Sequence, residues 1–156
     1  MKKSKLLMML ILLVAGLWLG KLALSPTQII AVHRSGYAAR IILKNPPLTR
    51  RTKLLWWNKN RKLLEEKYNL PRVNARGDYY VSIWDYADGY KEEEDEDRLC
   101  FEDKAPPKNC IDKKNWVMTV EQSLSSKRII YSIGEDTFET LPDGKIVKQH
   151  FTFTVR

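Results

Sequence analysis

The stretch LLMMLILLVAGLWLGKLAL, residues 6–24, decides how the whole chain is organised. Lys21 is its single charged residue. As a helix rising about 1.5 Å per residue, it would be about 28 Å long, close to the roughly 30 Å hydrocarbon thickness of a bilayer. We therefore predict a transmembrane anchor over 6–24, with these positions in the bilayer: Leu6, Leu13, Trp18 and Leu24.

A cleaved signal peptide is the alternative interpretation of this stretch, because a lysine-rich start precedes an apolar core. Cleavage after Ser25 would leave Pro26 beyond the scissile bond, which disfavours processing. If the anchor is retained, the positive-inside rule places residues 1–5 in the cytoplasm. Residues 25–156 would then form one domain outside the cytoplasm.

Charge is segregated along this domain. Residues 34–76 hold 12 basic and 2 acidic side chains, whereas residues 77–112 hold 4 basic and 12 acidic ones. The two blocks could pair with each other, or the basic block could face anionic lipid headgroups. Nucleic-acid binding is not expected, because the basic block lies in the wrong compartment and a large acidic block follows it.

The two cysteines, Cys100 and Cys110, are both in the predicted extracytoplasmic domain. In an oxidising compartment their default interpretation is a disulfide. Closing so short a loop would contribute about 2.5–3 kcal/mol in the chain-entropy model. Two buried free thiols are the alternative, and a metal site is disfavoured because CxxC spacing and a neighbouring histidine are absent from the sequence.

The apolar patterning predicts an α+β fold. A hairpin is expected from strands at 28–32 and 37–43, which flank a Ser-Gly turn. An amphipathic helix is predicted from Thr49 or Arg50 to Tyr68. Further strands are predicted at 79–84, 98–101, 115–122, 128–133, 136–141 and 146–155. We expect the helix to pack on an antiparallel sheet.

Trp56 and Trp57 are the heaviest apolar pair of helix 50–68. They either fill the core beneath the sheet, or the basic helix lies on the membrane surface beside the anchor. The continuation of the apolar stripe through Leu63 and Leu64 favours the core. Leu55 is the apolar residue that falls outside this stripe.

Catalytic chemistry is not expected. His33 and His150 are the two histidines, and neither is accompanied by a nucleophile motif, a glycine-rich phosphate loop or an HExxH sequence. We therefore predict no catalytic residue, no cofactor and no metal. The acidic run 92–97 is expected to be a solvated loop, and it lacks the ligand spacing of an EF-hand.

The turn after the strand at 79–84 is the candidate protein-binding site. It combines aromatic anchors with acids, a composition typical of interface hot spots. Its members are Trp84, Asp85, Tyr86, Asp88 and Tyr90. The alternative is that the rings pack against the end of the sheet.

Several segments resemble a family of enterobacterial inner-membrane proteins classed as a domain of unknown function. The matching segments are Ile30-Ala31-Val32-His33, Lys44-Asn45-Pro46, Trp56-Trp57, Glu66-Lys67-Tyr68-Asn69-Leu70-Pro71, Trp84-Asp85-Tyr86, Asp88-Gly89-Tyr90-Lys91, Asp97-Arg98-Leu99-Cys100-Phe101 and Asn109-Cys110-Ile111. The resemblance implies an anchored protein with paired cysteines, but no activity.

We thus expect a non-enzymatic, single-pass inner-membrane protein whose periplasmic domain binds another protein, as an immunity protein or an envelope accessory factor would. The expected partners are the lipid bilayer, through the N-terminal helix, and one protein. The alternative is a membrane-surface or cation-binding module that uses helix 50–68 or the acidic run 92–97.

Overall fold

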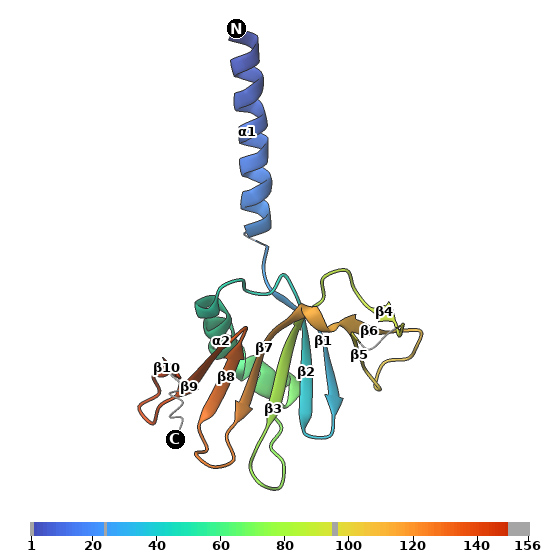
Figure 1. Ribbon diagram of the computed structural model, residues 1–156, viewed down its shortest axis with the longest axis vertical. Coiled ribbons are helices and arrows are strands. Elements are labelled where there is room, and N and C mark those ends of the chain that lie inside the picture. The colour runs from blue at the N-terminus through green and yellow to red at the C-terminus, as the bar shows by residue number, and fades with distance from the viewer. Residues whose placement is uncertain (1, 24, 95–96, 150–156) are drawn as a thin grey trace, which may run out of the picture.

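The computed structural model describes residues 2–23, 25–94 and 97–149. In this part of the chain, a seven-stranded sheet and a three-stranded sheet follow an N-terminal helix (Figure 1). The elements are α1 (Lys2–Ala23), β1 (Gln28–Ser35), β2 (Ala38–Lys44), α2 (Arg50–Tyr68), β3 (Tyr80–Asp85), β4 (Lys91–Glu92), β5 (Arg98–Cys100), β6 (Lys108–Asp112), the short 3₁₀-helix η1 (Lys113–Asn115), β7 (Trp116–Gln122), β8 (Ile129–Ile133), β9 (Asp136–Thr140) and β10 (Ile146–Lys148).

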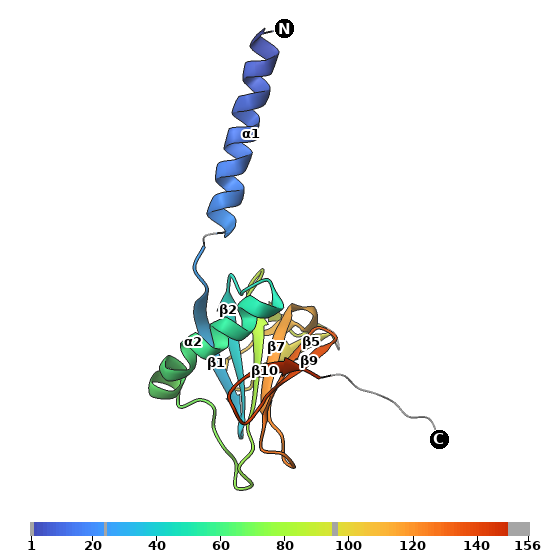
Figure 2. The same cartoon turned by 90° about the vertical axis from the view of Figure 1, so that its left-hand side faces the viewer.

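Helix α1 stands apart from the sheets in both views (Figure 1, Figure 2). Leu13, a predicted anchor position, is 65% exposed. Leu24 lies outside the described residues, as do the side chains of Leu6 and Trp18. Among the described residues, no helix combines the length and the apolar character needed to cross a membrane.

The large sheet has the strand order β1-β2-β3-β7-β8-β9-β10. The predicted hairpin forms from β1 and β2. The prediction of an antiparallel sheet is wrong at one pair, because β2 and β3 run parallel from Ala38 opposite Tyr80 to Leu43 opposite Asp85. The 19-residue helix α2 lies in the connection between them. This connection brings the chain back to the end of the sheet at which β2 began, as a parallel pair requires.

Helix α2 has the predicted bounds because both of its ends are capped. At the start, Thr49 Oγ1 accepts the backbone N–H of Thr52, and Thr52 Oγ1 accepts the backbone N–H of Thr49. This reciprocal pair satisfies two backbone donors that the first turn leaves unpaired. At the end, Asn69 adopts the left-handed conformation with φ of 50° and closes the helix.

Helix α2 crosses one face of the large sheet (Figure 2). Its first residue, Arg50, pairs with Asp136 of β9, whereas its last carbonyl, from Tyr68, accepts a hydrogen bond from Arg34 of β1. The apolar stripe therefore packs on the sheet, but the prediction is wrong for Leu63, which is 46% exposed. Trp57 is 1% exposed and joins the main core, which also contains the following buried residues: Ala39, Ile41, Leu43, Leu64, Leu70, Tyr79, Val81, Ile83, Val117, Met118, Val120, Tyr131 and Ile133.

The small sheet, ordered β4-β6-β5, covers the other face of the large sheet near β1 and β2 (Figure 1). Ile42 of β2 packs there with Phe101 and Ile111, and we call these three residues the second core. Ile41 and Leu43, the neighbours of Ile42 along β2, belong to the main core on the opposite face. Residues 41–43 of β2 are thus a continuous apolar run, because both faces of the strand are buried at these positions.

Candidate functional site

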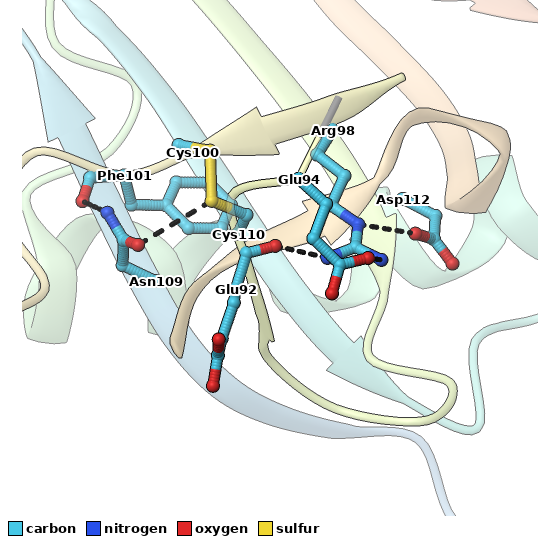
Figure 3. The surroundings of a disulfide bond; sticks show 8 residues. All are labelled: Glu92, Glu94, Arg98, Cys100, Phe101, Asn109, Cys110 and Asp112. Atoms are coloured by element: carbon cyan, nitrogen blue, oxygen red, sulfur yellow. Dashed lines mark hydrogen bonds and ion pairs between the residues drawn. A yellow bond between two sulfur atoms is a disulfide. The ribbon is translucent and has the colours of Figure 1, made fainter. Parts of the chain in front are cut away.

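Cys100 and Cys110 form the predicted disulfide, with an S–S distance of 2.07 Å (Figure 3). They lie directly opposite each other on β5 and β6. Beside them, the backbone N–H of Phe101 donates to the carbonyl of Asn109 at 2.9 Å. The cysteines therefore occupy the adjacent non-hydrogen-bonded position, where opposing side chains approach most closely. Residues 101–109 are closed into a loop that we call the disulfide loop.

Asp112 joins the three strands of the small sheet through its carboxylate. Lys91 Nζ from β4 donates to Oδ2 at 2.6 Å, and Arg98 Nε from β5 lies 3.5 Å from Oδ1. Lys114 adds a third cation at 3.9 Å. The hydrogen bond from Lys91, followed by the charges of Lys91, Lys114 and Arg98, holds the pKa of Asp112 below its ordinary value of 3.8.

The described part of the acidic run 92–97 turns toward Arg98. The guanidinium donates to the carbonyl of Glu92 and to a carboxylate oxygen of Glu94, the latter at 2.9 Å (Figure 3). Residues 95 and 96 lie outside the described residues. Within the described ranges, no group of three His, Cys, Asp or Glu side chains is arranged to hold a metal ion.

The predicted protein-binding residues lie at the end of β3 and in the turn beyond it. The rings of Trp84, Tyr86 and Tyr90 are half-buried and pack against the second core. Asp85 Oδ1 accepts the backbone N–H of Ala87 at 3.0 Å. The side chain of Asp88, by contrast, is 86% exposed. The rings hold the two sheets together, and Asp88 is the member of the set that projects furthest into solvent.

His33 forms a polar chain that the sequence analysis did not predict. Its Nδ1 lies 2.7 Å from Asp103 Oδ1, and its Nε2 lies 2.6 Å from Tyr90 Oη. The ring stacks on Phe101 with centroids 3.9 Å apart and is almost fully buried. The two polar partners are 70 and 57 positions away along the chain. No local spacing could reveal them, and a histidine inside an apolar strand was the one available signal.

The partners of His33 determine which of its ring nitrogens carries a hydrogen toward Asp103. An ionised carboxylate accepts hydrogen bonds and donates none, so His33 Nδ1 carries a hydrogen and donates to Asp103. In the neutral tautomer with a hydrogen on Nδ1, Nε2 accepts the O–H of Tyr90. Burial, with smaller contributions from Tyr86 and Asp103, raises the pKa of Tyr90 to about 12, which keeps the phenol protonated at neutral pH. These hydrogen bonds of His33 connect β1 to the turn before β4 and to the disulfide loop.

A separate hollow of about 470 Å³ lies between the first turns of α2 and the strands β9 and β10. We call it the α2–β10 groove, and its lining residues are Arg50, Arg51, Leu54, Leu55, Asn58, Asp136, Phe138, Ile146 and Lys148. Phe138 faces Lys148 across the two strands, and Ile146 lies two residues before Lys148. Alternation along a strand therefore puts all three on the face that meets the helix. Leu55, the residue outside the helix stripe, is 56% exposed here.

The rim of the α2–β10 groove is basic. Asp136 pairs with Arg50 and, at 2.6 Å, with Lys148. The hydrogen bond from Lys148 is the main cause that holds the pKa of Asp136 below its ordinary value of 3.8, and Arg50 adds to it. One carboxylate and three cations thus line the hollow, the third cation being Arg51. The groove combines an apolar floor with an excess of two positive charges.

These features define a class of protein: an α+β domain of three layers, stapled by a disulfide, that follows an exposed apolar helix. The chain belongs to a family described as "Enterobacterial putative membrane protein (DUF943)", whose model matches residues 1–150. The function of this family is unknown, and its description supports a membrane location. No curated protein and no solved structure matches the chain.

Proposed function

We propose that the chain is a single-pass inner-membrane protein whose periplasmic domain, residues 25–156, binds another protein and catalyses no reaction. In this proposal residues 1–5 lie in the cytoplasm and residues 6–24 form the anchor. The observation that carries the binding role is the α2–β10 groove, an apolar hollow with a basic rim beside β10, which is the outermost strand of the sheet in the described part of the chain.

Helix α1 and the family support the membrane part of the proposal. The large apolar side chains between Leu7 and Leu17 are 48–67% exposed. A helix that is apolar on all sides is typical of burial in a membrane or in a protein core. The family description names membrane proteins, and a disulfide suits an oxidising compartment such as the periplasm. The end of the anchor, up to Leu24, rests on the sequence.

The α2–β10 groove fits an extended peptide segment that carries alternating apolar side chains and at least one carboxylate. Strand β10 is the last strand of the large sheet among the described residues, so a peptide can add to its outer edge. Alternate side chains of such a peptide would enter the apolar floor between Leu55 and Phe138. The excess positive charge of the rim selects an acidic partner over a basic one.

Peptide display on the full-length protein in lipid nanodiscs tests this proposal. Extended peptides with alternating apolar residues and acidic residues are expected to be enriched. Leu55→Asp should abolish their binding, and Arg51→Glu should remove the preference for acidic peptides. Leu63→Asp and Lys59→Glu are matched controls, because both residues are exposed on α2 but lie outside the groove.

Equal loss of binding in the groove variants and the control variants would contradict the proposal. So would enrichment of basic peptides. Selection of peptides only after residues 150–156 are deleted would instead assign the groove to the chain's own C-terminal residues. Circular dichroism and urea titration of each variant show whether a loss of binding reflects unfolding.

A further inference from the structure

The segment between β2 and α2, residues 45–49, lies on the end of the sheet domain that faces α1 in both views (Figure 1, Figure 2). Thr27 Oγ1 donates to the carbonyl of Asn45 at 2.7 Å, which joins this segment to the chain leaving α1. Thr27 is four residues beyond Ala23, the last residue of α1, so the connection spans at most about 14 Å. The segment is therefore held close to the end of the helix.

Leu48 is the most exposed large apolar side chain of the described domain, at 88%. Pro46 and Pro47 precede it, and their rings restrict the backbone that presents it. A surface hollow of about 610 Å³ runs beside the segment and is lined by both prolines, Leu48 and Lys44. A leucine presented to solvent beside a basic side chain offers both the apolar area and the positive charge that favour binding to an anionic membrane surface.

The charges around Leu48 suit anionic headgroups. Lys44 is exposed and lines the first hollow, and Lys114, which is 80% exposed, lines a second hollow that also contains Leu48. Asp85 lines both hollows but is half-buried, and the exposed Asp88 of the neighbouring turn lines neither of them. A lysine close to an anionic membrane strengthens the contact about fivefold, equivalent to about 1 kcal/mol.

We propose that the Pro46–Leu48 loop rests on the outer surface of the bilayer that holds α1, with Leu48 in the interface and with Lys44 and Lys114 on phosphate headgroups. This inference rests on the proposed anchor, and it goes beyond the anchor because it fixes which end of the domain meets lipid. It leaves the α2–β10 groove free for a protein, because Leu48 does not line that groove.

The test uses the full chain in liposomes of phosphatidylethanolamine and phosphatidylglycerol. Leu48→Cys is labelled with an environment-sensitive fluorophore, and both native cysteines are already paired. Leu124→Cys is the matched control, since Leu124 is 57% exposed and belongs to the β7–β8 connection at the far end of the domain (Figure 1). Nitroxide carried on lipid headgroups should quench the label at 48 and leave the label at 124 unaffected. Lys44→Gln combined with Lys114→Gln should weaken the contact roughly 30-fold.

Three outcomes would overturn the inference. Protein that does not float with the liposomes would overturn both the anchor and the loop contact. Protein that floats but shows equal quenching at 48 and 124 would overturn the loop contact alone. A label at 48 that is shielded from water but not quenched by lipid would assign the loop to a protein contact instead.

Discussion

Removing the disulfide should destabilise the domain by an amount that follows from its loop length. Cys100 and Cys110 are separated by 10 positions. The chain-entropy model then gives about 2.7 kcal/mol at 25 °C, which corresponds to about a 100-fold change in the unfolding equilibrium constant. The loop also presents Asp103 to His33, so releasing the disulfide loop should loosen the contact between the small sheet and β1.

Urea titration of the full chain in mild detergent measures this loss through tryptophan fluorescence. Trp84 packs on the second core and reports on this region. The variant with Cys100→Ala and Cys110→Ala, and the reduced wild-type protein, should both unfold at lower urea than the oxidised protein. Reductant should have no effect on the double variant, which is the control. Oxidised and reduced wild-type proteins with the same midpoint and slope would refute the reasoning.

Three further predictions concern the helix and the small sheet. Leu64→Ala should cost about 3 kcal/mol in urea titration because Leu64 is fully buried, whereas Leu63→Ala on the exposed face of α2 should cost little; equal losses would contradict the packing. Thr49→Ala should lower the free energy of unfolding by about 1 kcal/mol because it removes the N-cap, and an unchanged urea midpoint would show that the cap is dispensable. The stabilisation from Asp112, whose pKa is lowered in the fold, should be complete above the ordinary pKa of 3.8 and lost as the pH falls through the lowered pKa. Asp112→Asn should therefore be less stable than wild type at pH 7, and the gap between their urea midpoints should narrow below about pH 4; a gap independent of pH would contradict this.

Helix α2 was predictable because its signals are local. Thr49 and Asn69 mark its two ends, and the stripe through Trp57 and Leu64 has helical spacing. The hairpin β1–β2 was equally local, since Gly36 with φ of 60° supplies its turn. The parallel pairing of β2 and β3 was not predictable in this way. The alternation of residues in a strand does not say at which end of the sheet the chain re-enters after α2.

The small sheet was mostly missed because its strands are short. β4 has 2 residues and β6 has 5, and neither carries the repeated apolar alternation that marks a strand. Cys100 and Cys110 predicted a disulfide, but they did not indicate that it joins two paired strands. The α2–β10 groove depends on which strands lie beside the start of α2, so its residues come together only in the folded domain. Leu55, outside the helical stripe, was the one sign of it in the sequence.

Photocrosslinking in living cells tests the central claim most directly. A photoreactive amino acid is placed at Leu55 in the α2–β10 groove or at Leu63, which is exposed on the same helix but outside the groove. We predict a discrete protein adduct at 55 that disappears with Arg51→Glu, and no such adduct at 63. An adduct that forms equally at both positions, or that is indifferent to Arg51, would contradict a binding role for the groove, as would the absence of any adduct at 55.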